Sequence, residues 1–278
     1  GGTEQQLRKK LLAGLILLVL LTAWLLWANT ALEVNHFVIE SEKLPASFDG
    51  FRIAQVSDLH NAGFWQDVAE ALRQIQPDII VLTGDLIDSG KTDVDAALAF
   101  AGQAAQIAPC YFVSGNHEAW SPGHWEKLRE GLEQSGIVLL ENERVSLGRD
   151  GEHLTMLGLS DPAFGGDHAR ILGELAAGEG YKILLSHRPE RMKLYAEADI
   201  DLVFSGHAHG GQFRIPFLGG VIAPDQGLFP EYDAGRFERG DTVMLVSRGI
   251  GNSIIPLRIC NRPEILVAEL KVSVGISG

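Results

Sequence analysis

Cysteine is scarce in this chain of 278 residues, which contains only Cys110 and Cys260. The two lie far apart and form no CxxC pair, so they suggest no disulfide framework of the kind that holds small secreted domains together. We interpret both as buried thiols, with a single Cys110–Cys260 bridge as the alternative.

Positive charge is scarce as well. The sequence has 23 Lys and Arg residues against 36 Asp and Glu residues, a formal net charge of −13. Proteins that bind along a nucleic-acid backbone need a basic surface, so we expect no nucleic-acid partner. Phosphate chemistry is not excluded, because bound metal ions can supply positive charge locally.

The sequence also lacks internal repeats, low-complexity tracts and any linker rich in Pro, Gly or Ser. Residues 31–278 should therefore form one domain. Continuous apolar runs such as "PDIIVLTGD" alternate with helical segments such as "WQDVAEALRQIQ". This alternation is typical of buried strands in an α/β fold. After residue 213 the pattern changes to strands, and we expect two central sheets with helices outside.

One long apolar run is present, from Leu11 to Ala28, and it carries no charge. As a helix it would be about 27 Å long, close to the roughly 30 Å hydrocarbon core of a bilayer. Arg8, Lys9 and Lys10 precede it. By the positive-inside rule, residues 1–30 are predicted to be a cytoplasmic tail and a single-pass anchor, with the domain outside. A cleaved signal peptide is the alternative, although its apolar core is normally about 7–15 residues.

A short polar cluster follows each of five strand-like runs. In chain order these clusters are "SDLHN", "TGDLID", "SGNHE", "LLSHRPE" and "SGHAHGG". Strand ends are where α/β folds place their sites, and oxygen with imidazole donors suits Mn, Fe or Zn. The candidate metal ligands are Asp58, His60, Asp85, Asn116, His187, His207 and His209. Seven donors are too many for one tetrahedral ion, and they predict two metal ions that share Asp85 as a bridge.

The motifs D-x-H, G-D, G-N-H-[DE], a lone His and G-H-x-H, in this order, resemble the calcineurin-like metallophosphoesterase family. The stretches "GHAHGGQ" and "RGIGNSIIPLRICNRPEI" further resemble its membrane-anchored bacterial phosphodiesterase branch. The resemblance covers roughly residues 31–272. It implies an α/β fold with a two-sheet β-sandwich core flanked by helices, here preceded by one N-terminal transmembrane helix.

The resemblance also implies roles for residues. One metal would take Asp58, His60, Asp85 and His209, and the other Asp85, Asn116, His187 and His207. Each ion is divalent, with manganese expected first and iron or zinc as alternatives. A hydroxide bridging the metals would be the nucleophile. His117 would be the general acid, oriented by the carboxylate of Asp88 or Glu118. Asp161 and Asn252 are further candidates beside the substrate, with an ordinary turn role as the alternative for each.

The implied function is hydrolysis of a phosphodiester or pyrophosphate bond, on a simple phosphate ester or on a membrane lipid or lipid-linked substrate such as UDP-2,3-diacylglucosamine. The apolar segment Phe213 to Pro230 is interpreted as a lid for an acyl or isoprenoid chain, or else as a hairpin packed over the core. The alternatives are a non-catalytic metal-binding scaffold and a nuclease or nucleotide phosphodiesterase. The complete ligand set with His117 favours an enzyme, and the acidic charge disfavours a nuclease. The sequence carries no signal for an oligomeric state.

Overall fold

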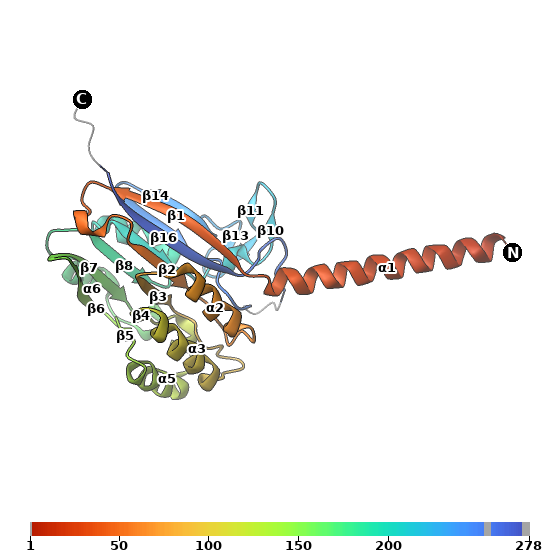
Figure 1. Cartoon of the computed structure of the whole chain (residues 1–278), viewed down its shortest axis with the longest axis horizontal. Coiled ribbons are helices and arrows are strands. Elements are labelled where there is room, and N and C mark those ends of the chain that lie inside the picture. The colour runs from red at the N-terminus through yellow and green to blue at the C-terminus, as the bar shows by residue number, and fades with distance from the viewer. Residues whose placement is uncertain (1, 253–256, 274–278) are drawn as a thin grey trace, which may run out of the picture.

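The computed structural model describes residues 2–252 and 257–273. Two six-stranded sheets lie face to face with helices on their outer faces, and one long helix projects from an end of the domain (Figure 1). The predicted two-sheet α/β fold with one N-terminal apolar helix is confirmed. Residues 253–256, inside the "RGIGNSIIPLRICNRPEI" stretch, lie outside the described residues.

The first sheet has the order β1-β16-β2-β3-β4-β5. Strands β2 to β5 run parallel, whereas β16 is antiparallel to β2 and parallel to β1. Its strands are β1 (Glu33–Ser41), β2 (Arg52–Val56), β3 (Ile79–Thr83), β4 (Cys110–Val113), β5 (Val138–Leu139) and β16 (Glu264–Val272). The helices on its outer side are α2 (Trp65–Ile75), α3 (Val94–Ile107) and α5 (Pro122–Gln134).

The second sheet has the order β14-β15-β9-β8-β7-β6. Its strands are β6 (Glu143–Arg149), β7 (Glu152–Leu159), β8 (Lys182–Ser186), β9 (Leu202–Ser205), β14 (Gly235–Arg239) and β15 (Thr242–Val246). Two helices pack on its outer face, α6 (His168–Leu175) and α7 (Met192–Glu197). The short helices are α4 (Asn116–Ala119) and the 3-10 turns η1 (Ala46–Phe48), η2 (Pro162–Phe164), η3 (Pro189–Arg191) and η4 (His209–Gly211).

Strand β3 shows why the buried strands carry apolar residues at every position. Ile80 and Leu82 point to the helices of the outer layer, whereas Ile79 and Val81 enter the core between the two sheets. Successive side chains of a strand face opposite sides, and both sides are buried here, so every position is hydrophobic. The same double burial holds the carboxyl end of the strand, and therefore Asp85 just beyond it, in a fixed place.

Two sequence expectations need correction. Cys110 is buried as expected, but Cys260 is exposed, and both are free thiols rather than a bridge. Segment 213–230 forms two short ribbons, β10 (Arg214–Ile215) with β11 (Gly219–Gly220) and β12 (Ile222–Ala223) with β13 (Gly227–Leu228). This agrees with the hairpin alternative, except that four large side chains of the ribbons are exposed to solvent instead of packed on the core: Phe217, Leu218, Leu228 and Phe229.

Helix α1 (Gly2–Thr30) is longer than the predicted span, and from Thr3 onward it is long and apolar enough to cross a membrane. Its last turn docks on the domain. The Asn29 side chain accepts a hydrogen bond from the Arg258 amide at 2.7 Å and donates to the Arg258 carbonyl at 3.2 Å. Trp27 stacks under the guanidinium of Arg262, 4.7 Å from the ring centre, and Ala28 is buried. The helix therefore joins the domain through specific contacts.

Candidate metal centre

All seven candidate ligands lie at the carboxyl ends of parallel strands, where the two sheets meet. Asp58 and His60 follow β2, Asp85 follows β3, Asn116 begins α4 after β4, His187 follows β8, and His207 and His209 follow β9. Every one of the seven is buried. The edges of the two sheets thus bring together, in one buried cluster, residues that are up to 151 positions apart in the sequence (209 − 58).

The backbone at most of these positions is left-handed. Asp58, His60, Asp85, His207 and His209 have φ between 44° and 64°. Residues other than glycine adopt this region at a cost of order 1–3 kcal/mol each, and such residues concentrate at functional sites. The strain is consistent with side chains that must point inward from tight turns.

Two glycines allow the close packing. A Cβ atom on Gly115 would lie 2.2 Å from Oδ1 of Asp85, and one on Gly206 would lie 2.3 Å from Oδ2 of Asp58. Neither position can carry a side chain without moving a carboxylate of the cluster. There is therefore a steric reason for glycine directly before Asn116 in "SGN" and directly before His207 in "SGH".

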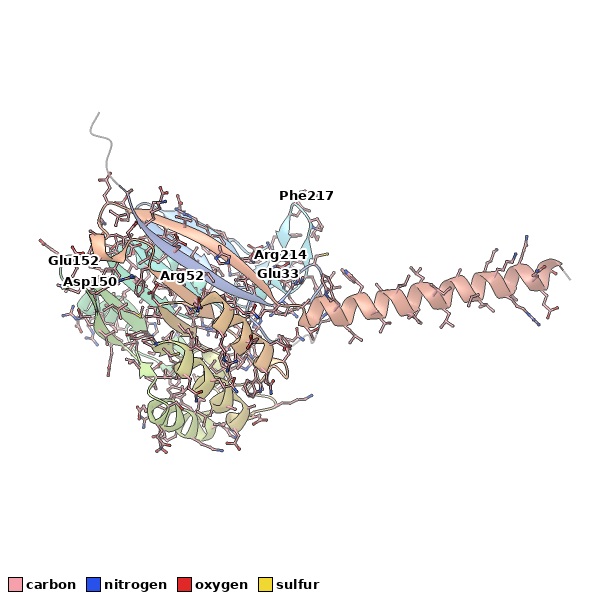
Figure 2. The ribbon with its side chains drawn as sticks, viewed as in Figure 1. Glu33, Arg52, Asp150, Glu152, Arg214 and Phe217 are labelled. Atoms are coloured by element: carbon pink, nitrogen blue, oxygen red, sulfur yellow. The ribbon has the colours of Figure 1, made fainter. Side chains whose placement is uncertain are left out.

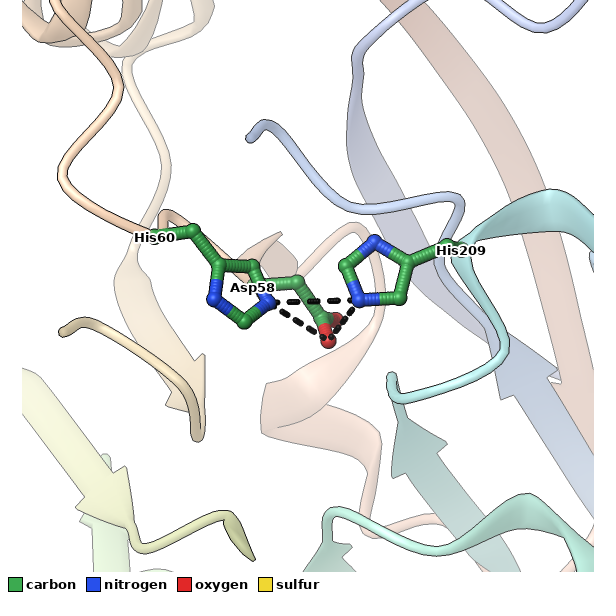
Figure 3. A group of neighbouring side chains, drawn as sticks. All are labelled: Asp58, His60 and His209. Atoms are coloured by element: carbon green, nitrogen blue, oxygen red, sulfur yellow. Dashed lines mark hydrogen bonds and ion pairs between the residues drawn. The ribbon is translucent and has the colours of Figure 1, made fainter. Parts of the chain in front are cut away.

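The first group of ligands is Asp58, His60 and His209 (Figure 3). The two Nε2 atoms lie 3.2 Å apart, and Oδ1 of Asp58 lies 3.9 Å from Nε2 of His60 and 3.4 Å from Nε2 of His209. Burial lowers the pKa of His60 to about 4 and holds the pKa of His209 well below its usual value. Both imidazoles are therefore held neutral, which is the form that binds metals.

The second group is Asp85, His187 and His207. Oδ2 of Asp85 lies 3.1 Å from Nε2 of His187 and 3.6 Å from Nε2 of His60, so this carboxylate stands between the two groups. Burial opposes ionisation of both partners, but their mutual attraction outweighs it, raising the pKa of His187 to about 10 and keeping that of Asp85 well below its usual range. A cation would take the place of the His187 proton.

These donors fit divalent metal ions. The amide oxygen of Asn116 is buried and has no hydrogen-bond partner among the described residues, which normally costs free energy. In the first group the Nε2 atoms of His60 and His209 and a carboxylate oxygen of Asp58 face one another, as the ligands of one ion do (Figure 3). Oxygen and nitrogen donors without sulfur match the preferences of Mn, Fe and Zn.

His117 lies beside the cluster, with Nε2 4.0 Å from Oδ2 of Asp85. The backbone amide of Ser89 donates a hydrogen bond to its Nδ1 at 2.9 Å. In the neutral ring the proton is therefore on Nε2, the atom that faces the cluster. His117 can thus present a hydrogen-bond donor to a ligand bound there.

The two carboxylates expected to orient His117 also have other partners. Asp88 lies close to both His60 and His117, because one ligand atom from each of these three side chains lies within 4.8 Å of the others. Asp88 lies 3.7 Å from Nδ1 of His60, and its other oxygen accepts from the amides of Gly90 and Lys91. The fully buried Glu118 accepts from the amides of Asp85, Leu86 and Gly115 at 2.8–2.9 Å. Glu118 therefore ties the loop after β3 to the start of α4.

The two remaining residues predicted from the sequence, Asp161 and Asn252, lie in different surroundings. Asp161 is buried and forms a bidentate pair with Arg188, at 2.6 Å from Nε and 3.1 Å from Nη2, while also capping η2. It thus combines the turn role with a place beside the second ligand group. Asn252 lines a cleft that His117 and Gly251 also line.

Two residues of the site, Arg188 and Asp225, were not predicted from the sequence. Nη1 of Arg188 and Oδ2 of Asp225 each lie 2.8 Å from Nε2 of His207, and they also contact each other. Arg188 directly follows a candidate ligand, which was an available signal. Asp225 belongs to the turn between β12 and β13, and no local pattern connects it to the metal centre.

A cleft of about 940 Å³ opens beside this centre. Its wall includes His60, Asp88 and His117. It also includes Asn29 and Thr30, which form the end of α1. Within the described part of the chain, no residue of segment 213–230 lines it, so the predicted lid does not cover this opening.

A family model of calcineurin-like phosphoesterases matches residues 51–211. The chain belongs to this family. The uncharacterized metallophosphoesterase YkuE of Bacillus subtilis is 30% identical over 251 residues, covering 86% of each chain. The phosphodiesterase YaeI of Escherichia coli is 30% identical over 236 residues, which is 79% of this chain and 82% of YaeI. A Danio rerio transmembrane protein with a metallophosphoesterase domain is 31% identical over 284 residues, 95% of this chain and 63% of the fish protein.

Membership of the family and the His/Asp clusters together make this phosphoesterase a metal-dependent phosphoester hydrolase. The family could be predicted from the sequence because the five motifs occur in the right order, each at the end of a buried strand.

Proposed function

We propose that this phosphoesterase uses two divalent metals to hydrolyse a phosphodiester or diphosphate bond in an amphipathic substrate held by the membrane. The observation that carries the proposal is the cleft itself, which joins His60 and His117 to Asn29 and Thr30 at the end of the apolar helix. A substrate at the centre would therefore lie next to the membrane surface. We propose further that α1 stays uncleaved, with its N-terminus in the cytoplasm.

The proposed ligand sets follow the two groups. Asp58, His60 and His209 would hold one ion, and Asn116, His187 and His207 the other, with Asp85 between them. We propose manganese first, with iron or zinc as alternatives. When bound, two such ions polarise phosphoryl oxygens and make water a nucleophile at neutral pH.

The protein's own groups would complete the reaction. His117, with its proton on Nε2, would donate to the oxygen that leaves phosphorus as the ester bond breaks. The buried position of the ligands would exclude bulk water from their side of the centre. The end of α1 would keep the apolar part of the substrate at the membrane while the phosphate occupies the cleft.

The test is a hydrolysis panel with the full-length protein in detergent micelles or nanodiscs. It compares a soluble chromogenic diester, soluble nucleotides, phospholipids and a lipid-linked nucleotide sugar, with Mn²⁺, Fe²⁺ or Zn²⁺ added after chelation. We expect metal-dependent hydrolysis with a higher kcat/KM for a lipid substrate. Asp85→Ala should abolish activity on every substrate, because it removes the carboxylate between the groups.

Two results would contradict the proposal in different ways. Full activity of Asp85→Ala after exhaustive chelation would overturn the two-metal reaction. Faster hydrolysis of soluble nucleotides than of every lipid would leave the reaction intact but overturn the substrate class, and would favour a nucleotide phosphodiesterase.

A further inference from the structure

The ends of the two small ribbons carry large hydrophobic side chains that the domain leaves uncovered. We call these four residues the ribbon tips: Phe217 and Leu218 in the turn between β10 and β11, and Leu228 and Phe229 where the chain leaves β13 at the open end of the second ribbon. Phe217 is fully exposed, and the other three are between 65% and 72% exposed. Scattered exposed leucines are ordinary, but a contiguous apolar surface marks an interaction site.

A backbone hydrogen bond joins the two ribbons. The amide of Phe229 donates to the carbonyl of Val221, the residue that follows β11, at 2.8 Å. Phe217 and Phe229 both have positive φ, at 71° and 53°. Bulky residues rarely adopt this conformation, and here it directs two aromatic side chains outward rather than into the core.

A short chain segment places the ribbon tips beside the end of α1. The amide of Arg214 in β10 donates to the carbonyl of Ile259, and Phe213 pairs with Ile259 in a β-bridge. The preceding residue, Arg258, is the partner of Asn29 in the last turn of α1. The β10–β11 ribbon stands next to the junction of α1 with the domain (Figure 1), and Phe217 marks its tip (Figure 2).

The geometry points to a second membrane contact, in which the ribbon tips enter the interface of the bilayer that α1 crosses. This inference rests on the proposed membrane-spanning role of α1. Only two residues separate the end of α1 at Thr30 from β1 at Glu33, so the domain stays against the bilayer. A surface on this side of the domain, next to the point where the helix leaves, meets lipid before any soluble partner.

The chemistry of the surface favours the bilayer interface over recognition of anionic headgroups. Aromatic and aliphatic side chains are those that settle at the boundary between headgroups and acyl chains. The nearest basic side chain of the ribbon, Arg214, is paired with Asp233 at 2.9 Å. Burial of apolar surface is therefore the interaction that the ribbon tips offer.

A second contact would fix the tilt of the domain. The helix alone provides one attachment, whereas the helix and the ribbon tips together define the orientation of the domain on the bilayer. In that orientation the cleft lined by Asn29 and Thr30 opens at the membrane surface, within reach of a lipid phosphate.

The test measures lipid contact of single labelled positions in the full-length protein in phosphatidylcholine nanodiscs. The background carries Cys260→Ser, because Cys260 is the exposed thiol and Cys110 is buried. In this background Phe217→Cys is labelled with an environment-sensitive fluorophore, and quenching by lipids carrying a nitroxide at a shallow or deep position is recorded. Asp150→Cys, in the exposed turn between β6 and β7 at the opposite end of the domain (Figure 2), is the matched control. Leu18→Cys, within α1, reports whether the helix is in the bilayer.

We expect blue-shifted emission and several-fold stronger quenching by the shallow nitroxide at position 217 than at position 150, with deep quenching at position 18. Quenching at 18 with equal, weak quenching at 217 and 150 would overturn the second contact while leaving the anchor intact. Absence of quenching at 18 would overturn both the anchor and this inference. None of these readings depends on hydrolysis, so they are separate from the test of the reaction.

Discussion

Replacing Asp225 by alanine should weaken metal binding much more than it weakens the fold. The Asp225 side chain is 56% exposed, so its ion pair with Arg188 should add no more than about 1 kcal/mol to the free energy of unfolding. Its contact with Nε2 of His207, at 2.8 Å, is of a different kind. Outer partners that orient a ligating histidine typically change metal affinity by about 10–100-fold, or roughly 1.4–2.7 kcal/mol. The larger effect should therefore appear in the metal titration.

The measurement is a calorimetric Mn²⁺ titration of metal-free full-length protein, paired with thermal unfolding without metal. We expect the site that contains His207 to bind Mn²⁺ about 10–100-fold more weakly in Asp225→Ala than in the unmodified protein. The unfolding midpoint should fall by no more than about 2–4 °C, the shift that 1 kcal/mol produces in a domain of this size.

Asp233→Ala is the matched control for this experiment. Asp233 also holds an arginine and a backbone amide of the small ribbons, those of Arg214 and Gly220, without touching a candidate ligand. It should leave Mn²⁺ affinity unchanged. Equal losses in both variants would show that Asp225 acts through the ribbons in general, and unchanged affinity in Asp225→Ala would refute the orienting role.

Three further changes test other parts of the site. His117→Ala should retain metal and lower turnover by about 10²–10⁴, less for substrates with good leaving groups, and loss of metal in this variant would instead make His117 a ligand. Glu118→Gln should destabilise the protein by roughly 2–4 kcal/mol in denaturant unfolding. The NH2 group of the glutamine would face the buried backbone amides that now donate to the Glu118 carboxylate, so two donors would oppose each other. Exposed Glu126→Gln should change the stability little. Gly206→Ala should lower both stability, by about 1–3 kcal/mol, and metal content, because the new Cβ would lie 2.3 Å from Asp58; Gly173→Ala, in open space, is the control, and equal effects would contradict the steric argument.

The sheet and the polar clusters were predictable because both leave local marks in the sequence. A strand buried on two faces needs an unbroken apolar run, as in Ile79 to Thr83, and the chain must turn where the run ends. A polar cluster with Gly at that position then indicates a site. Short elements lack a repeated pattern: α7 was not predicted from the sequence, and the two ribbons were expected only as the hairpin alternative for segment 213–230.

The partners of the site residues were harder to predict, because they are often backbone groups or distant side chains. The donor to Nδ1 of His117 is the amide of Ser89, and any residue except proline supplies an amide. Asp225 reaches Arg188 across 37 positions through a turn whose shape the sequence does not specify. That a carboxylate orients His117 stays a prediction: Asp88 lies near this imidazole, whereas Glu118 is bonded to backbone amides.

The contacts of segment 258–261 connect α1 to the candidate metal centre. Arg258 pairs with Asn29 of α1, and its fully buried guanidinium donates to the carbonyls of Arg248 and Gly251. Asn261, three residues on, donates to the carbonyl of His209 at 2.7 Å. The same segment therefore fastens both the end of α1 and the turn that carries a candidate ligand. Because one segment contacts both, the turn that carries His209 keeps a fixed place relative to the end of α1.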